Sequence, residues 1–168
     1  MKQIIVLFFV AVMLSAGLRA DALPEYTLKA AYLYNFALLT DWPKEEESTG
    51  FNMCFYKENL GSASDALQNK IVGNKKVKVL NVTTAEEAKG CQMLFIPESE
   101  GQNGEKMIRQ LVKTPVLIVS ENASSNDAHI VIIREGRKLA FDISLKALKY
   151  SNLLLSSRLL KLARKVEQ

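Results

Sequence analysis

The sequence predicts an α/β fold: a layered, largely parallel sheet with an antiparallel hairpin at one edge and helices on both faces. Helix-like and strand-like segments alternate along the chain, as they do in sheets built from strand–helix–strand units. The segments Leu94–Ile96 and Val116–Val119 are uninterrupted apolar runs, which are typical of strands covered on both faces. Glu135–Lys138 is a hairpin-like turn between two apolar segments, so we expect the antiparallel edge there.

The composition is that of one globular domain. The chain has 168 residues, of which 48% are apolar and 24% charged, with 22 Lys and Arg against 18 Asp and Glu. The high apolar content and the nearly balanced charge exclude an intrinsically disordered chain. A net charge of +4 is too small to indicate nucleic-acid binding.

Residues 1–22 are predicted to be a secretory signal peptide. Lys2 gives a positive start, Ile4–Ala16 is an apolar run too short to cross a bilayer, and Ala20–Ala22 is an A-x-A cleavage site. An uncleaved membrane anchor is the alternative, which the length of the apolar run disfavours. We therefore expect export, cleavage after Ala22, and a single α/β domain over residues 23–168.

The first predicted helix begins at Pro24 and Glu25, which suit the start of a helix, and runs to about Leu39. The segment Asp41–Pro43 ends it, because the residue before a proline is pushed out of the helical conformation. The helix is apolar almost all round, so we expect it to be covered on all sides.

The rest of the chain alternates between predicted strands and short helices. The strands are 51–56, 77–82, 93–96, 116–120, 130–133 and 139–143. Ser62 is expected to cap a helix that ends near Lys70, Thr84 and Glu87 form a capping box for a helix that stops at Gly90, and Asn103 can cap a helix through Val112. The last element is predicted to be an amphipathic helix over Leu155–Val166, capped by Ser157 and basic on its other side.

Few residues suggest catalysis or a bound cofactor. His129 is the only histidine, no motif supports it, and a structural or surface role is the favoured interpretation. One His and two separated Cys are too few for a zinc site. Gly101–Gly104 lacks the features of a nucleotide-binding loop and is interpreted as a plain loop, and Glu45–Glu47 as a solvated loop. We therefore expect no enzymatic activity, no metal and no cofactor.

The two cysteines have two interpretations. An oxidising compartment permits a disulfide between Cys54 and Cys91, which would stabilise the fold by roughly 4 kcal/mol on chain-entropy grounds. The alternative is a pair of buried free thiols. The chain has no C-x-x-C motif, so a thiol oxidoreductase has little support.

Several segments together carry a family resemblance. They are, in order, LKAAYLYNF (28–36), DWP (41–43), CQMLFI (91–96), PVLIVS (115–120), FDI (141–143) and SSRLLKLA (156–163). The aromatic helix followed by Trp-Pro, and the terminal Ser-Ser-x-Leu-Leu-x-Leu-Ala, are the most specific. Over nearly the whole mature chain, the sequence resembles the YfiR/HmsC family of periplasmic proteins.

The resemblance implies a periplasmic repressor that binds the sensory domain of an inner-membrane YfiN-type diguanylate cyclase. Such binding would lower cyclic-di-GMP output and biofilm formation. The resemblance also implies release of the repression by an OmpA-like outer-membrane lipoprotein, a homodimer, and a disulfide at the positions matching Cys54 and Cys91. The chain lacks the second cysteine pair that members can carry, and Ser144 stands where Asn commonly follows the Phe-x-Ile strand. These departures leave full redox control and the subfamily open.

Two surfaces are candidates for contact with such a partner. One is the aromatic side of the first helix, and the other is the basic side of the last helix, although core packing and simple solvation are the respective alternatives. The candidate contacts are Tyr32, Phe36, Leu154, Arg158 and Lys161. A different class of function, a periplasmic small-ligand binding or enzymatic domain, would instead use a cleft at the carboxyl ends of the parallel strands.

Overall fold

The computed structural model describes residues 25–43, 50–136 and 138–168. The predicted signal peptide and Glu45–Glu47 lie outside these residues. The helices are α2 (Glu25–Leu38), α3 (Ser62–Asp65), α4 (Ala85–Ala88), the 3-10 helix η2 (Glu98–Glu100), α5 (Gly101–Leu111), α6 (Leu145–Leu148) and α7 (Ser157–Leu162). The strands are β1 (Thr40–Asp41), β2 (Gly50–Tyr56), β3 (Ile71–Val72), β4 (Lys75–Val82), β5 (Met93–Ile96), β6 (Leu117–Ser120), β7 (Ile130–Glu135), β8 (Lys138–Ser144), β9 (Leu154–Leu155) and β10 (Lys165–Glu167).

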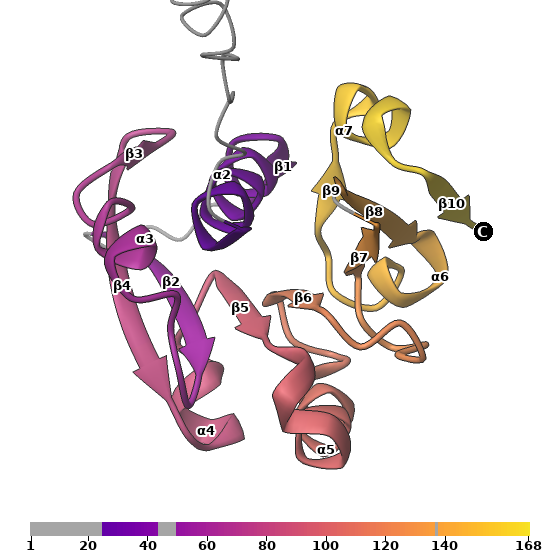
Figure 1. Ribbon diagram of the computed structural model, residues 1–168, viewed down its shortest axis with the longest axis horizontal. Coiled ribbons are helices and arrows are strands. Elements are labelled where there is room, and N and C mark those ends of the chain that lie inside the picture. Colours follow the sequence, from indigo (N-terminus) through magenta and orange to yellow (C-terminus); the bar gives the residue numbers. More distant parts are fainter. Residues whose placement is uncertain (1–24, 44–49, 137) are drawn as a thin grey trace, which may run out of the picture.

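The strands form one large curled sheet and one small sheet (Figure 1). The large sheet has the order β10-β8-β7-β6-β5-β2-β4-β3, and β1 pairs with β9 separately. Its pairs are parallel except β7–β8 and β3–β4. The predicted α/β sheet, its largely parallel order and its antiparallel hairpin are therefore confirmed.

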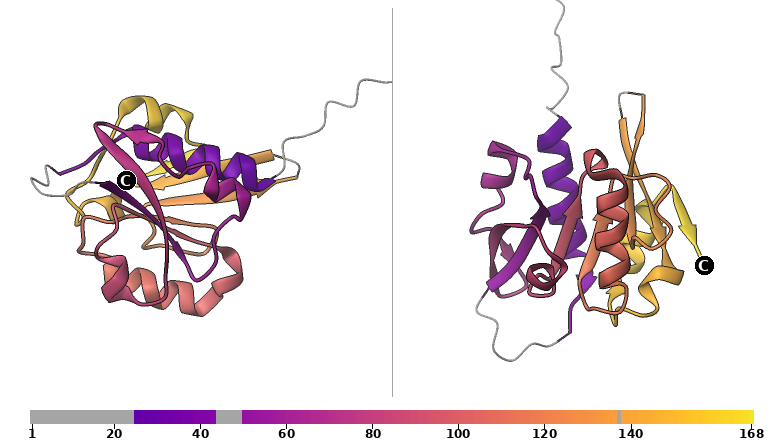
Figure 2. Two further views of the ribbon diagram at one scale, coloured as in Figure 1. Left: turned by 90° about the vertical axis from the view of Figure 1, so that its left-hand side faces the viewer. Right: turned by 90° about the horizontal axis from the view of Figure 1, so that it is seen from below.

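Helices cover both faces of the large sheet, with α2 on one face and α4 and α5 on the other (Figure 2). Side chains along each buried strand alternate between the two faces, as the pleat requires. In β2, Met53 and Phe55 join the cluster that packs on α2, while Cys54 joins the cluster that packs on α4 and α5. The apolar strands are continuous runs because both of their faces are buried.

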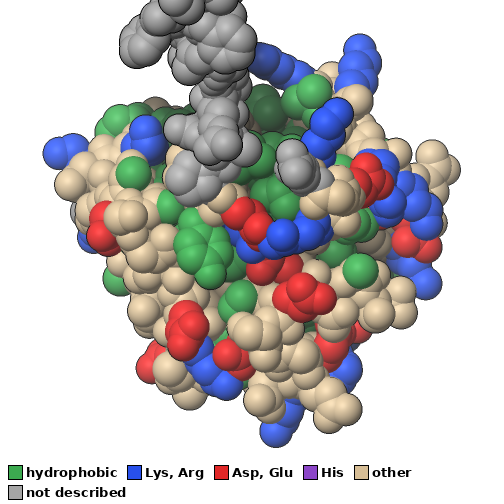
Figure 3. All heavy atoms as spheres, in the orientation of Figure 1, with side chains coloured by type: hydrophobic (Ala, Val, Ile, Leu, Met, Phe, Trp, Pro, Cys, Tyr) green, Lys and Arg blue, Asp and Glu red, His purple; other side chains and the backbone are tan. Residues whose placement is uncertain are grey.

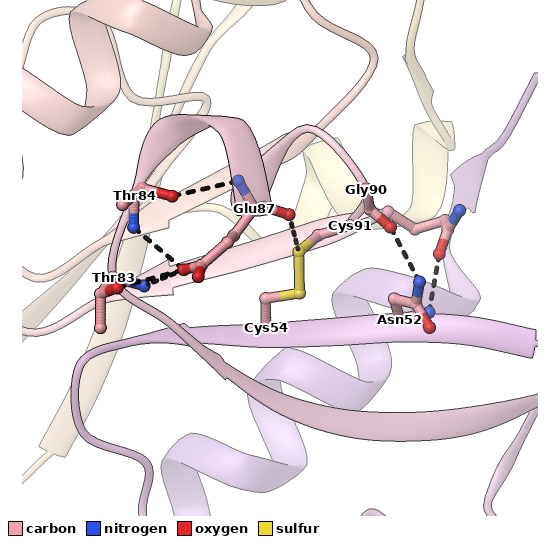
Figure 4. Close-up of a disulfide and its surroundings, with 8 residues drawn as sticks. Asn52, Cys54, Thr83, Thr84, Glu87, Gly90 and Cys91 are labelled. Carbon is pink, nitrogen blue, oxygen red and sulfur yellow. Dashed lines mark hydrogen bonds between the residues drawn. A yellow bond between two sulfur atoms is a disulfide. The ribbon is translucent and has the colours of Figure 1, made fainter.

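A disulfide joins β2 to the residue that leads into β5 (Figure 4). Cys54 and Cys91 are bonded, with their Cα atoms 6.0 Å apart, and both side chains are buried. The disulfide prediction is confirmed, and the structure describes no free cysteine. The predicted capping box of α4 lies beside it: Thr84 Oγ1 accepts from the Glu87 N–H at 3.3 Å, and Glu87 Oε2 accepts from the Thr84 N–H at 3.2 Å.

The C-terminal segment differs from the predicted single helix. Helix α7 ends at Leu162, and the chain then becomes extended at Ala163 and enters β10. The Arg164 N–H donates to the Phe141 carbonyl at 2.9 Å, so pairing with β8 replaces the helical hydrogen bonds. The cap is Ser156 rather than Ser157. Apolar residues at helical spacing therefore belong here to a short helix and a strand that pack on the same core.

Three other boundaries also differ from the prediction. Helix α5 begins at Gly101, so Asn103 lies inside it and the segment Gly101–Gly104 is helical rather than a loop. The helix packs closely on β5 at Gly104, where an added Cβ would lie 2.8 Å from Ile96 Cγ2. Helix α3 has Gly61 rather than Ser62 at its cap position and ends at Asp65.

Helix α2 ends one residue before the predicted boundary and is not covered on all sides. Leu38, its last residue, is 46% exposed. The two residues Thr40 and Asp41 then form β1 instead of a simple turn. None of the helices in the described residues has the length and hydropathy of a membrane span.

Candidate partner-binding surface

The C-terminal end of α2 is fastened to the start of α7. Strand β1 pairs with β9 in antiparallel fashion, with Thr40 opposite Leu155. The Ser156 N–H donates to the Leu39 carbonyl at 2.9 Å, which extends this connection. Ser156 also caps α7, because its side chain accepts from the Leu159 N–H at 3.2 Å. Two helices that are far apart in the sequence are thereby held beside each other.

Between the two helices lies a groove of about 270 Å³. It is lined by Tyr32, Asn35, Phe36, Leu38, Leu39, Phe141, Arg158, Leu159 and Leu162. Its floor is aromatic: the Phe36 and Phe141 rings are 4.9 Å apart, and Tyr32 lies 5.8 Å from each of them. The Tyr32 hydroxyl donates to the Leu139 carbonyl on β8 at 2.8 Å. Edge-to-face packing and this hydrogen bond give the groove a fixed floor.

The rim of the groove combines exposed apolar and basic side chains. Leu38 is 46% exposed, Leu154 on the neighbouring β9 is 68% exposed and Leu162 is 62% exposed. Arg158 and Lys161 are also exposed, and neither forms an ion pair within the described residues. Figure 3 shows hydrophobic side chains beside basic ones at the upper right, over α7. Such a surface complements a partner that offers apolar anchors and carboxylates.

The structure brings most of the predicted contacts to this one place. Tyr32, Phe36 and Arg158 line the groove, Leu154 lies on β9, and Lys161 lies on α7. Phe36 is only 1% exposed, so it supports the groove as part of the core and offers almost no surface of its own. The role of these residues in partner binding stays a prediction.

Three residues that line the groove carry no local sequence signal for it: Leu38, Leu162 and the strand residue Phe141. Leu38 belongs to a helix that is apolar all round, and nothing in its spacing marks the side left uncovered. Leu162 was placed on the buried side of a longer helix, but α7 ends there and leaves it exposed. Phe141 reaches α2 only because the sheet brings β8 beneath it, and no local pattern signals this.

A second candidate place, the crevice at the carboxyl ends of β2, β5 and β6, is largely filled by ion pairs. Lys29 is 7% exposed and lies 2.7 Å from a Glu25 oxygen and 2.6 Å from a Glu121 oxygen. Glu25 also pairs with Arg134. The remaining space is about 180 Å³, which is below the range of most small-ligand pockets.

These ion pairs keep Lys29 charged despite its burial. Burial by itself lowers the pKa of Lys29, but the hydrogen bonds to Glu121 and Glu25 outweigh it, and the pKa is raised. The hydrogen bond from Lys29 lowers the pKa of Glu25. The arrangement joins the start of α2 to the end of β6, and it occupies the place where the small-ligand alternative needs a cleft.

His129 is a buried structural residue. It is 0% exposed, and its Nδ1 accepts from the Ile118 N–H at 3.1 Å, which puts the ring proton on Nε2. Desolvation lowers the pKa of His129 to about 4, so the ring is neutral at physiological pH. The imidazole is therefore closed to solvent, and its acceptor nitrogen is already used by the backbone.

A larger hollow of about 610 Å³ lies at the opposite, amino ends of the parallel strands. Trp42, Phe51, Gln92 and Pro115 are among its lining residues. In open α/β sheets, ligands bind outside the carboxyl ends of the strands, so this hollow is not at the expected place. Leu38 lines both this hollow and the α2–α7 groove, and forms the ridge between them.

The fold and the surface define an α/β protein with an exposed groove whose rim carries apolar and basic side chains. Residues 26–164 match the YfiR/HmsC-like family, a span that contains α7 and all of α2 except its first residue. The chain therefore belongs to this family, whose members in general are periplasmic regulators of cyclic-di-GMP signalling and are not known as enzymes. A comparison with curated proteins gives no match.

Proposed function

We propose that this protein is a periplasmic repressor of an inner-membrane YfiN-type diguanylate cyclase. It binds the periplasmic sensory domain of the cyclase through the α2–α7 groove and its rim, and lowers cyclic-di-GMP output and biofilm formation. Family membership supports this function. The observation that carries the choice of surface is the exposed apolar rim beside Arg158 and Lys161, which form no ion pair within the described residues, over an aromatic floor.

The proposal has further parts that concern export and assembly. Residues 1–22 act as the signal peptide, and residues 23–168 form the mature periplasmic domain. The mature protein is a homodimer, and an OmpA-like outer-membrane lipoprotein releases the repression by competing for the protein. The repressor has no catalytic residue in this scheme.

Repression requires that the protein bind the inactive state of the cyclase more tightly than the active one. A shift from mostly active to mostly inactive needs about 5 kcal/mol of such preference. A few buried anchors can supply this amount, since single hot-spot side chains contribute about 2 kcal/mol or more each. Leu154 and Leu162 are suited to this role because folding leaves them exposed.

The test is complementation of a gene deletion with the cognate cyclase present and expressed. Deletion should raise cellular cyclic-di-GMP, and the wild-type gene should restore the low level. The variants Leu154→Asp and Arg158→Glu should fail to restore it, because they put a charge on an apolar anchor or reverse a rim charge. The controls Leu80→Asp and Lys113→Glu make the same changes at exposed positions on β4 and after α5.

Binding of the purified mature variants to the isolated sensory domain gives the direct measurement. Leu154→Asp should raise the dissociation constant at least tenfold, about 1.4 kcal/mol. Unchanged cyclic-di-GMP after deletion would refute the repressor function. Full repression by both groove variants would leave the function standing but refute the groove as its surface.

A further inference from the structure

Strand β10 (Lys165–Glu167) is an open edge of the large sheet. Among the described strands it pairs only with β8, and it lies at the outer margin of the molecule in Figure 1 and in the right-hand view of Figure 2. Ser144 directs its N–H to His129 on the β7 side, so the neighbouring Ile143 directs its backbone groups toward β10. Val166 lies opposite Ile143. Of two facing residues in a parallel pair, only one directs its N–H and C=O toward the other strand, and here that residue is Ile143. The N–H and C=O of Val166 therefore face outward, available to another strand.

The side chains of β10 are arranged for pairing with a second copy of the same strand. Lys165 and Glu167 are exposed, and neither side chain makes a hydrogen bond or ion pair in the part of the chain that the structure describes. Val166 between them is half-buried against the core cluster under α7. In an antiparallel two-fold pair centred on Val166, Lys165 of each copy lies opposite Glu167 of the other. Opposite charges that face each other across strands stabilise the pair.

At the other end of the sheet, the outer side of β4 is covered by β3 and by the residues that precede it. The Val77 N–H donates to the Lys70 carbonyl at 2.7 Å, and the Val79 N–H donates to Gln68 Oε1 at 2.8 Å. These contacts cover the outer edge of β4. Lys76 and Lys78 also carry the same charge on the same face, so self-pairing there would be repulsive. The β10 edge has neither form of protection.

We propose that β10 pairs with β10 of a second copy of this chain, and so joins the two large sheets across a two-fold axis at Val166. This inference rests on the proposed homodimer and supplies its surface. A three-residue strand buries far less than the roughly 1,600 Å² of a standard interface. The dimer therefore forms reversibly and dissociates on dilution.

Charge reversal tests the pairing. Sedimentation of the mature protein over a concentration series should show a monomer–dimer equilibrium. Lys165→Glu and Glu167→Lys should each raise the dissociation constant at least tenfold, because each sets like charges opposite each other at both ends of the pair. The double variant K165E/E167K should restore the wild-type constant. Lys113→Glu is the control for the change in net charge.

A cysteine cross-link gives a second, independent test. The Cα atoms of facing residues in an antiparallel pair are about 5.5 Å apart, which suits a disulfide. Val166→Cys should therefore form a covalent dimer on oxidation. Glu167→Cys is the matched control, since the two copies of this residue would lie on opposite sides of the axis and beyond disulfide reach. The native pair Cys54–Cys91 is already bonded and does not compete.

The outcomes separate the inference from the proposed function. A monomer at all concentrations overturns both the homodimer and this surface. Three results would overturn the β10 surface while leaving a dimer. Neither single charge reversal weakens the dimer, or the double variant fails to restore it. The third is that Glu167→Cys cross-links as well as Val166→Cys. None of these results bears on repression, which the deletion and complementation experiment measures separately.

Discussion

At the scale of single residues, Lys29 and His129 are two basic side chains buried in the described part of the chain, and their charge states are opposite. Lys29 stays charged because Glu25 and Glu121 compensate for the loss of water around it. No carboxylate among the described residues forms an ion pair with His129, so burial keeps the ring neutral, and its Nδ1 accepts from the Ile118 N–H. A buried ammonium needs counter-charges, whereas an imidazole can give up its proton.

The buried imidazole predicts a specific pH dependence of stability. The pKa of His129 is about 4 in the folded chain, below its ordinary value of 6.5. Between these values the unfolded chain binds more protons than the folded one, so the free energy of unfolding falls as the pH is lowered from 7 to 4, by about 3 kcal/mol from this residue. In His129→Asn, whose side-chain oxygen can replace Nδ1 as the acceptor, this part of the loss should disappear.

The measurement is guanidinium unfolding of the wild type and His129→Asn at several pH values from 7 to 4. The lowered pKa values of Glu25 and Glu87 contribute to both proteins, so the difference between the two curves isolates His129. A wild-type slope that His129→Asn reproduces would contradict the prediction.

At the scale of elements, the sequence predicts strands better than it predicts helix ends. Strands such as β5 and β6 are buried on both faces, and their continuous apolar runs are visible locally. The boundary between α7 and β10 is not visible, because Leu159 and Val166 belong to the same core whether the chain between them is helical or extended. The chain after Leu162 is extended because the Arg164 backbone pairs with β8, and this tertiary contact leaves no local pattern in the sequence.

The residues of the candidate surface were partly predictable from local sequence, but their arrangement was not. The aromatic side of α2 and the basic residues of α7 were predicted, because each is a pattern within one segment. The groove itself was not, since it depends on β1 pairing with β9 and on Phe141 lying beneath α2. The sequence therefore named several residues of the surface without the geometry that unites them.

The cap of α7 gives a prediction at this scale. Ser156→Ala removes the side-chain acceptor for the Leu159 N–H and should cost about 1 kcal/mol. Ser157→Ala, one residue further on, changes an exposed side chain that does not cap the helix and should be nearly neutral. Global unfolding and amide hydrogen exchange of α7 in the two variants provide the comparison. Equal effects would show that Ser156 is not the functional cap.

At the scale of the whole molecule, one core cluster joins both ends of the described chain. It contains Leu33 and Phe36 of α2 together with Leu159 of α7, and Val166 of β10 packs against it. The strands between them contribute to the same cluster. The α2–α7 groove lies over this cluster, so its shape depends on the fold as a unit rather than on a separate lobe.

This shared core predicts that the mature domain unfolds in one cooperative transition. Trp42 is the single tryptophan, it lies 4.9 Å from the Phe51 ring, and its Nε1–H donates to the Ala37 carbonyl at 2.9 Å, so its fluorescence reports the α2 side of the core. Fluorescence and far-ultraviolet circular dichroism should give the same denaturant midpoint. Leu159→Ala, at the far end of the same cluster, should lower the free energy of unfolding by about 2–5 kcal/mol. Both probes should then report the same lowered denaturant midpoint. The contradicting result is a Trp42 fluorescence midpoint that Leu159→Ala does not change. It would mean that α7 unfolds separately from α2, and that the groove lies between two independently stable parts.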